Sequence, residues 1–223
     1  MLVVVALAVA WQAWSWPDVG ALAKARPRTT AFIERYHADQ RAAGRSDRIA
    51  WTWVDAAAIS PHLKRAVLVA EDINFFGHRG FDTGEIRHAV TRALGDVELP
   101  RGASTITQQL AKNLWLSPSR NPLRKVKEAA LTWQLERTLG KRRILELYLN
   151  VVELGPGIYG AEAASRRYFA KSAAELTEDE AAALAAALPR PTTWHPGVES
   201  RAYRRYVETI RARMDRAVLP RVF

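Results

Sequence analysis

The sequence predicts a mainly helical fold, because apolar residues recur at helical spacing and strand signals are nearly absent. Leu63, Ala66, Val67 and Ala70 show this spacing in the segment that leads to Glu71. Capping residues and prolines mark the starts and ends of further helices. The chain has 223 residues and no internal repeat or low-complexity segment. It is therefore long enough for one domain with a full core, or for one domain with a small lobe.

Prolines, capping residues and residue spacing indicate where the expected elements begin and end, in chain order. A proline-punctuated connector over 17–50 holds one short helix, and residues 51–54 alternate like a brief strand. Ser60 and Pro61 begin the helix that ends at Glu71, with proline at its favoured first position. The short helix of the connector is expected at 30–42. Further helices are expected at 84–94, 121–139, 141–150, 160–169, 177–189 and 198–218.

The composition gives the chain a net charge of +10, because 33 Lys and Arg face only 23 Asp and Glu. Such a surface favours anionic partners, namely nucleic acid, acidic lipid headgroups or a phosphorylated substrate. The chain has no cysteine, which excludes disulfides and thiolate metal sites.

The N-terminus is almost unbroken apolar sequence over 1–11, closed by Trp14, Trp16 and Pro17. Tryptophan at the end of an apolar run is typical of a membrane interface. The run is shorter than the ~20 residues of a spanning helix, and it lacks the basic start and small-residue cleavage site of a signal peptide. We expect residues 1–16 to be a membrane anchor, with the basic body outside the cytoplasm; a buried core helix is the alternative.

Chemistry-bearing residues are concentrated at 71–82. Glu71 and Asp72 are adjacent carboxylates at the end of an apolar helix, where the helix dipole disfavours negative charge. Three phenylalanines, a histidine, two glycines and Asp82 follow. Residues that break local preferences gather at functional sites. A solvated helix end beside core phenylalanines explains the pair equally well when it is taken alone.

Two further polar clusters follow. Residues 102–113 combine hydroxyls, adjacent amides and a lysine, which suit sugar hydroxyls and phosphate oxygens; a capped helix start at Ser104 or Thr105 is the simpler explanation. On the helix over 121–139, three charged residues share one face at three- and four-residue spacing, which is equally the geometry of an exposed salt bridge. They are Arg124, Lys125 and Glu128.

Taken together, these stretches resemble the glycosyltransferase family 51 peptidoglycan glycosyltransferases. The family's five motifs occur in order over 71–169, as EDINFFGHRGFD, GASTITQQLAKN, RKVKE, RILELYLN and GIYGAEAASRRYF. The Trp-Pro-Asp stretch after the apolar start looks like the monofunctional, membrane-anchored branch. No Ser-x-x-Lys with Lys-Thr-Gly follows, so the transpeptidase half of the bifunctional enzymes is not expected.

The resemblance implies a lysozyme-like helical lobe with a small, membrane-dipping jaw lobe at about 82–121. These lie in a glycosyltransferase domain over 51–223, after the anchor at 1–16 and the connector at 17–50. It also implies the reaction: a growing glycan, held as an undecaprenyl pyrophosphate, is transferred with inversion onto the 4-hydroxyl of lipid II.

Roles carry over only at matching positions. Glu71 matches the general base that takes the proton from the acceptor hydroxyl. Glu128 matches the second carboxylate near the donor pyrophosphate, acting through a divalent cation or by organising nearby basic residues. No cofactor is expected to be required, with Mg²⁺ or Mn²⁺ near Glu128 left open. The positions that match substrate-binding residues are Asp72, Phe75, His78, Gly80, Ser104, Thr105, Gln108, Gln109, Lys112, Asn113, Arg120, Arg124 and Lys125.

The chemistry agrees with the residues. A base needs a pKa nearer neutrality than an exposed glutamate has, and an apolar helix end beside Asp72 would raise the pKa of Glu71. The leaving pyrophosphate needs cations. These can come from Lys112, Arg120, Arg124 and Lys125.

Two other functions compete. A lysozyme-like lytic hydrolase has no use for a phosphate clamp, and a nucleic-acid-binding protein would show a recognisable motif, which is not visible. We therefore expect lipid II, the lipid-linked strand and the membrane as partners, with cell-division or elongation proteins as further candidates and no nucleic acid. The expected location is the bacterial inner membrane, with one span and a periplasmic catalytic domain.

Overall fold

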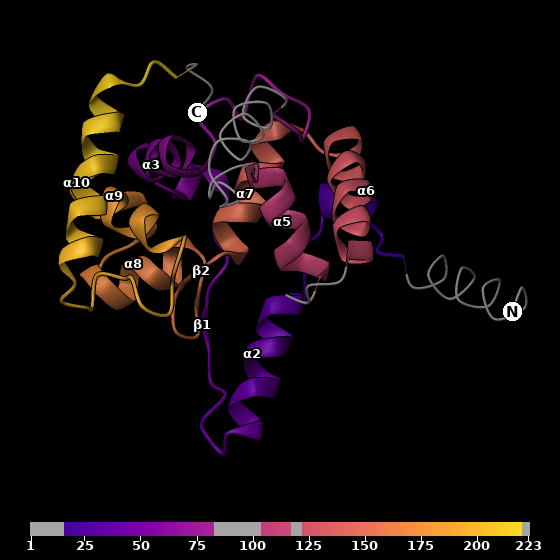
Figure 1. Ribbon diagram of the computed structural model, residues 1–223, viewed down its shortest axis with the longest axis horizontal. Helices are drawn as coiled ribbons and strands as arrows, with labels where there is room; N and C mark the ends of the chain where they lie inside the picture. The colour runs from indigo at the N-terminus through magenta and orange to yellow at the C-terminus, as the bar shows by residue number, and fades with distance from the viewer. Residues whose placement is uncertain (1–15, 83–103, 117–121, 220–223) are drawn as a thin grey trace, which may run out of the picture.

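The computed structural model describes residues 16–82, 104–116 and 122–219, and in these ranges the chain is mainly helical, as predicted (Figure 1). The α-helices are α2 (Ala31–Ala42), α3 (Pro61–Glu71), α5 (Ile106–Trp115), α6 (Pro122–Thr138), α7 (Lys141–Val151), α8 (Ala161–Phe169), α9 (Glu178–Ala187) and α10 (Arg201–Arg216). The strands are β1 (Ala50–Trp51), β2 (Glu153–Gly155) and β3 (Ile158–Tyr159), and the 3-10 turns are η1 (Gly20–Ala23), η2 (Ala56–Ala58) and η3 (Ala173–Glu175).

The helix starts follow their capping residues. Thr30, Ser60 and Thr177 accept hydrogen bonds from the first turns of α2, α3 and α9, and Thr177 forms the expected capping box with Glu180. The terminal helix is shorter than predicted, because Ser200 caps the start of α10. The expected helix at 84–94 and residues 1–15 of the expected anchor at 1–16 lie outside the described residues.

The strand predicted at 51–54 is wrong in its length, since β1 ends at Trp51. The side-chain amide of Asn150 bonds to both the N–H and the C=O of Val54, at 2.9 Å each, so these groups cannot continue a ladder. A small sheet in the order β1-β3-β2 results, with β3 parallel to β1 and antiparallel to β2. The turn at 155–157 joins β2 to β3, and the sequence did not predict either strand.

The helices pack in two groups around one core. The C-terminal helices α9 and α10 pack against α3, and α5 packs against α6 and α7 (Figure 1). The apolar stripe of α3 that the sequence indicated is buried, with Leu63, Ala66 and Val67 at most 1% exposed. This packing brings the end of α3 to the start of α5. Most of the predicted jaw range lies outside the described residues, and the part that is described, α5, belongs to the core with α6 and α7.

Within the described ranges, we find no helix of sufficient length and apolar character to cross a bilayer.

Gly80 shows how tightly the loop after α3 fits. Its φ is +88°, and a Cβ placed there would lie 2.8 Å from Thr132 Cγ2 and 3.0 Å from Glu136 Cγ on α6. Both the backbone conformation and the close approach of α6 therefore require glycine.

We expect Gly80→Ala to lower the free energy of unfolding by about 2–5 kcal/mol, since left-handed strain and overpacking add. Gly44 is the matched control, because its φ is +64° and nothing lies within 4 Å of an added Cβ. Gly44→Ala should cost only the backbone strain, about 1–2 kcal/mol. Urea unfolding of the detergent-solubilised chain measures both. Equal losses would show that α6 does not restrict the loop.

Candidate active site

Glu71 is the last residue of α3, and its carboxylate is held by a chain of two hydrogen bonds. Gln109 Nε2 on α5 donates to Glu71 Oε2 at 2.7 Å, and the Tyr148 hydroxyl on α7 donates to Gln109 Oε1 at 2.9 Å. Because Oε1 of the amide is taken by the tyrosine, the NH₂ group must face Glu71. Three helices therefore fix the orientation of one carboxylate.

The electrostatic surroundings of Glu71 favour its protonated form. Burial raises the pKa of Glu71, and the charge of Asp72 adds to this, against the lowering effects of the Gln109 hydrogen bond and of Lys112. Burial likewise lowers the pKa of Lys112, against the raising effects of Glu128 and Glu71. A carboxylate with a raised pKa and an ammonium with a lowered pKa are suited to exchanging protons.

Asp72 holds the loop after α3 against the start of α5. Its buried carboxylate accepts the Ile106 N–H at the start of α5, at 3.0 Å, and lies 3.0 Å from His78 Nε2. His78 Nδ1 accepts the Gly80 N–H at 3.1 Å, which places the imidazole proton on Nε2, facing Asp72. The Thr105 hydroxyl closes the arrangement by donating to the Gly80 carbonyl at 2.7 Å. The loop is thus tied to the first turn of α5.

Several other predicted substrate-binding residues also lie inside the protein. Phe75 is fully buried, its ring edge-on to Phe76 and covered by the Lys141 ammonium at 4.3 Å. Thr105 is the N-cap of α5, where it forms a capping box with Gln108. Helix capping, the simpler explanation considered for this stretch, is therefore confirmed at Thr105. Ser104 and Lys112 are partly exposed, and Asn113 is 6% exposed.

Glu128 forms a buried ion cluster with the two basic residues that precede it on α6. Its carboxylate is 3% exposed, with Arg124 Nη1 at 2.9 Å from Oε2 and Lys125 Nζ bonded to Oε1. An ordinary exposed salt bridge is thus excluded, because the acid is buried while Lys125 remains 57% exposed. Lys112 is in electrostatic range of this cluster as well as of Glu71. Arg120, also predicted here, lies outside the described residues.

The sequence matches the transglycosylase family over residues 39–215. The chain belongs to this family. Three similar proteins, each called a biosynthetic peptidoglycan transglycosylase, come from Thiobacillus denitrificans (48% identity; 97% of this chain, 94% of the relative), Azoarcus sp. (44%; 99% and 95%) and Methylobacillus flagellatus (41%; 99% and 96%). The predicted membership of the family 51 peptidoglycan glycosyltransferases, and with it the enzyme class, is confirmed.

The residues around Glu128 in this transglycosylase do not fit a divalent cation. Each carboxylate oxygen of Glu128 faces a positive side chain, which repels a metal ion. In the ranges that the structure describes, no group of three His, Asp or Glu residues could hold one. A cation site would need several oxygen ligands, so we derive no step through a metal.

Tyr148 is the residue at this site that sequence reasoning missed. It lies among the apolar residues of α7, beside Ile144 and Leu145, where the spacing gives no sign of a role at the site, and it is fully buried. Its hydroxyl was the available signal, since a buried tyrosine usually needs a hydrogen-bond partner. That partner is Gln109.

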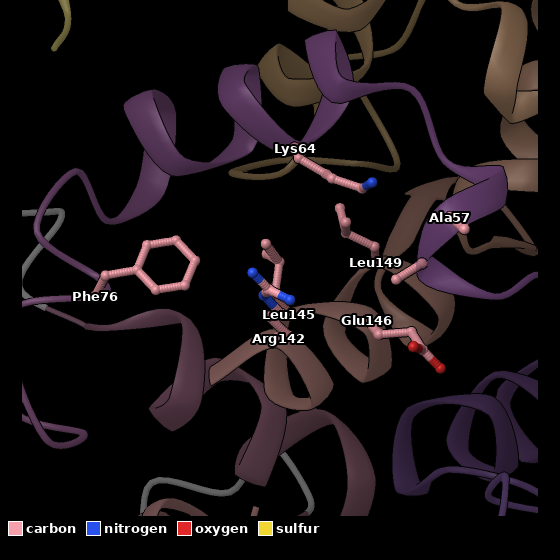
Figure 2. A pocket seen from close by; sticks show the side chains of 8 residues that line it. Ala57, Lys64, Phe76, Arg142, Leu145, Glu146 and Leu149 are labelled. Atoms are coloured by element: carbon pink, nitrogen blue, oxygen red, sulfur yellow. The ribbon is translucent and has the colours of Figure 1, made fainter. Parts of the chain in front are cut away.

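A separate pocket of about 280 Å³ lies between α3, η2 and α7 (Figure 2). Its walls are largely apolar, with Phe76 at one end and Glu146 towards the other. Burial lowers the pKa of Lys64, which lines this pocket, against the raising effect of Glu146. Neither Glu71 nor Glu128 lines this space, so it is distinct from the two carboxylates of the transglycosylase site.

Because the pKa of Glu71 is raised, we expect this residue to make stability depend on pH. The folded state holds this proton more tightly than the unfolded state, where the pKa is about 4.5. The contribution of Glu71 to the free energy of unfolding is therefore lost as the pH rises from the unfolded pKa through the folded pKa. Glu71→Gln should be more stable than the wild type at neutral pH, and this gain should shrink in acid.

Thermal unfolding across pH measures the effect, with Glu175→Gln as a control of opposite sign. Glu175 is exposed, and hydrogen bonds from Ser172 lower its pKa. Its contribution is present above the unfolded pKa and lost as pH falls, so the control should be less stable than the wild type at neutral pH. An unchanged or reduced stability of Glu71→Gln would contradict the burial argument.

Proposed function

We propose that this transglycosylase polymerises glycan strands of peptidoglycan, transferring a growing undecaprenyl-pyrophosphate-linked glycan onto the 4-hydroxyl of lipid II. The observation that carries this proposal is the difference between two acids, the half-buried Glu71 and the buried Glu128. Glu71 is oriented by an amide and has a raised pKa, whereas Glu128 is paired with two cations. One suits proton abstraction, and the other suits a phosphate-binding cluster. The names of the similar proteins support the same substrate.

In the proposed step, Glu71 accepts the proton of the acceptor hydroxyl. The acceptor oxygen forms a bond to the anomeric carbon of the donor sugar while the bond from that carbon to the pyrophosphate oxygen breaks. The pyrophosphate leaves with the bonding electron pair, and the configuration inverts because the displacement is direct. The hydrogen bond from Gln109 to Oε2 orients the carboxylate so that Oε1 can face the acceptor. The raised pKa makes Glu71 a stronger base than an exposed glutamate.

Cations stabilise the negative charge that develops on the leaving pyrophosphate. We assign this role to Arg124, Lys125 and Lys112, with Glu128 acting by holding the first two in place rather than through a metal ion. Arg120 remains a predicted member of this group. Lys112 couples the two ends of the site, since both Glu71 and Glu128 influence its pKa.

A lytic hydrolase is the second candidate, because a lysozyme-like lobe with a jaw at 82–121 would suit either reaction. Hydrolysis requires a general acid for a sugar leaving group and gives no role to a cluster of cations. The cluster around Glu128 therefore favours transfer. We further propose that residues 1–16 anchor the chain in the inner membrane with the catalytic domain in the periplasm, away from nucleic acid.

Glu71→Gln should lower the rate of strand formation from labelled lipid II by about 10²–10⁴-fold, since it removes the base but keeps a similar shape. Glycan is separated by length, and lysozyme digestion confirms the product. Glu175→Gln, far from the site in a surface capping box, should polymerise at the wild-type rate. If Glu71→Gln polymerises lipid II at a near wild-type rate, Glu71 is not the general base. Short muropeptides from finished wall, without a ladder, would favour the hydrolase.

Tyr148→Phe tests the orientation of Gln109. Without the tyrosine hydroxyl the amide can turn its oxygen towards Glu71, which favours the protonated acid. The acid limb of the pH–rate profile should then move to higher pH, with the largest loss of rate on the acid side.

Tyr203→Phe is the matched control, because Tyr203 is also buried and its hydroxyl donates to the Ala183 carbonyl at 2.8 Å, away from Glu71. Each variant loses one buried hydrogen bond and should lose about 1–3 kcal/mol of stability. Only Tyr148→Phe should move the acid limb. If the acid limb of the pH–rate profile stays at the same pH in both variants, Tyr148 contributes only to packing.

A further inference from the structure

Lys112 is within electrostatic range of both acids of the site, but neither acid holds it directly. Glu71 and Glu128 each act on its charge, and in the described part of the chain neither forms an ion pair with its ammonium. Two basic neighbours on α6 already occupy the oxygens of Glu128. Opposite charge alone therefore does not fix where the Lys112 side chain lies.

An aromatic ring on α2 meets this ammonium. Lys112 Nζ lies 5.9 Å from the centre of the Phe32 ring, within the distance at which the face of an aromatic ring attracts a cation. α2 packs against α5, the helix that carries Lys112, and in Figure 1 it lies next to one end of α5. Because a ring face neither accepts a proton nor carries a charge, it can hold the ammonium in place and leave its positive charge available.

The first turn of α2 is fixed, and the Phe32 ring is fixed with it. The buried Thr30 caps this helix by accepting the Ile33 N–H at 3.1 Å, and Ile33 is 2% exposed. Phe32 lies between these two buried residues and is itself half-buried. The helix cap and the core thus place the ring, so its position does not depend on Lys112.

Neither the motifs nor the family match points to Phe32. The five motifs begin at Glu71, and the match to the transglycosylase family begins at residue 39. We propose that Phe32 is a positioning residue for the reaction, whose ring face holds the Lys112 ammonium where the leaving pyrophosphate develops its charge. This inference rests on the proposed function, because it deepens the role assigned there to Lys112.

The contact would keep Lys112 charged as well as placed. Burial lowers the pKa of Lys112, and the positive charges of Arg124 and Lys125 lower it further. Glu71 and Glu128 act in the opposite direction, and these four are the charged groups within the described ranges that act on it from α3 and α6. A ring face favours the ammonium over the neutral amine. Since only the ammonium can stabilise the leaving pyrophosphate, loss of the ring face should first reduce activity at high pH.

Ordinary packing is the rival explanation, because a half-buried phenylalanine can simply fill space between α2 and α5. Phe32→Leu separates the two explanations, since leucine keeps an apolar side chain but has no ring face, whereas Phe32→Tyr keeps the face. Tyr36→Leu is the matched control. Tyr36 lies one turn further along α2, and its ring meets Tyr159 on β3, edge-on at 6.3 Å, so this variant loosens the helix at a different contact.

The reactivity of Lys112 tests the contact independently of polymerisation. The full, detergent-solubilised chain is treated with trace acetic anhydride from neutral to strongly alkaline pH, and mass spectrometry gives the extent of acetylation at Lys112. Thermal unfolding confirms that each variant is folded. The pH–rate profile of strand formation from labelled lipid II is recorded for the same proteins.

We expect Phe32→Leu to raise acetylation of Lys112 near neutral pH by about 2–10-fold, because more of the amine is neutral without the ring face. At strongly alkaline pH, where the amine is neutral in every variant, acetylation should match the wild type. The alkaline limb of the pH–rate profile should move to lower pH. Phe32→Tyr and Tyr36→Leu should match the wild type in each of these measurements.

Unchanged acetylation of Lys112 in Phe32→Leu, in a protein that polymerises lipid II, would overturn this inference alone and leave the proposed function intact. A rise of the same size at every pH would show greater exposure of the amine and would also count against the ring face. Equal effects in Phe32→Leu and Tyr36→Leu would assign the change to a loosened α2. If the wild type forms no strands, the proposed function falls together with the role of Phe32 in it.

Discussion

The carboxylate of Asp72 is the constraint on which the site depends. It accepts the first N–H of α5 and faces the proton on His78, so it joins the end of α3 to the start of a helix 34 residues further along the chain. The negative charge that is unfavourable at the end of α3 is favourable at the N-terminus of α5. The same contact brings Gln109 to Glu71. The departure from local preference at residues 71 and 72 is therefore resolved only by tertiary structure.

Glu71 and Glu128 differ because their surroundings differ. Burial raises the pKa of Glu71 and the adjacent Asp72 adds to this, while the hydrogen bond from Gln109 opposes it only in part. Glu128 has two cations in contact, and removing either would leave a buried charge incompletely paired, a costly change. The burial that raises the pKa of Glu71 lowers stability at neutral pH, a cost that proteins commonly bear at sites where reactivity is needed. Burial lowers the pKa of Lys112, and both Glu71 and Glu128 act on this ammonium electrostatically.

Much of the fold could be predicted from the sequence, because helical spacing and capping residues are local signals. Thr30, Ser60 and Thr177 start helices where expected. The errors came from contacts between distant residues: Asn150 ends the first strand by binding Val54. At the site, the motif positions named candidate residues but not their partners in the protein. Asp72 stays a predicted substrate-binding residue, and the structure adds that its oxygens are engaged by the start of α5 and by a histidine. Tyr148 received no role from the sequence, because periodicity carries no information about its hydroxyl.

The net charge of +10 does not by itself orient the molecule on a membrane, because basic residues lie on more than one face. Long-range attraction brings such a protein to an anionic surface in many orientations, whereas insertion of apolar side chains selects one.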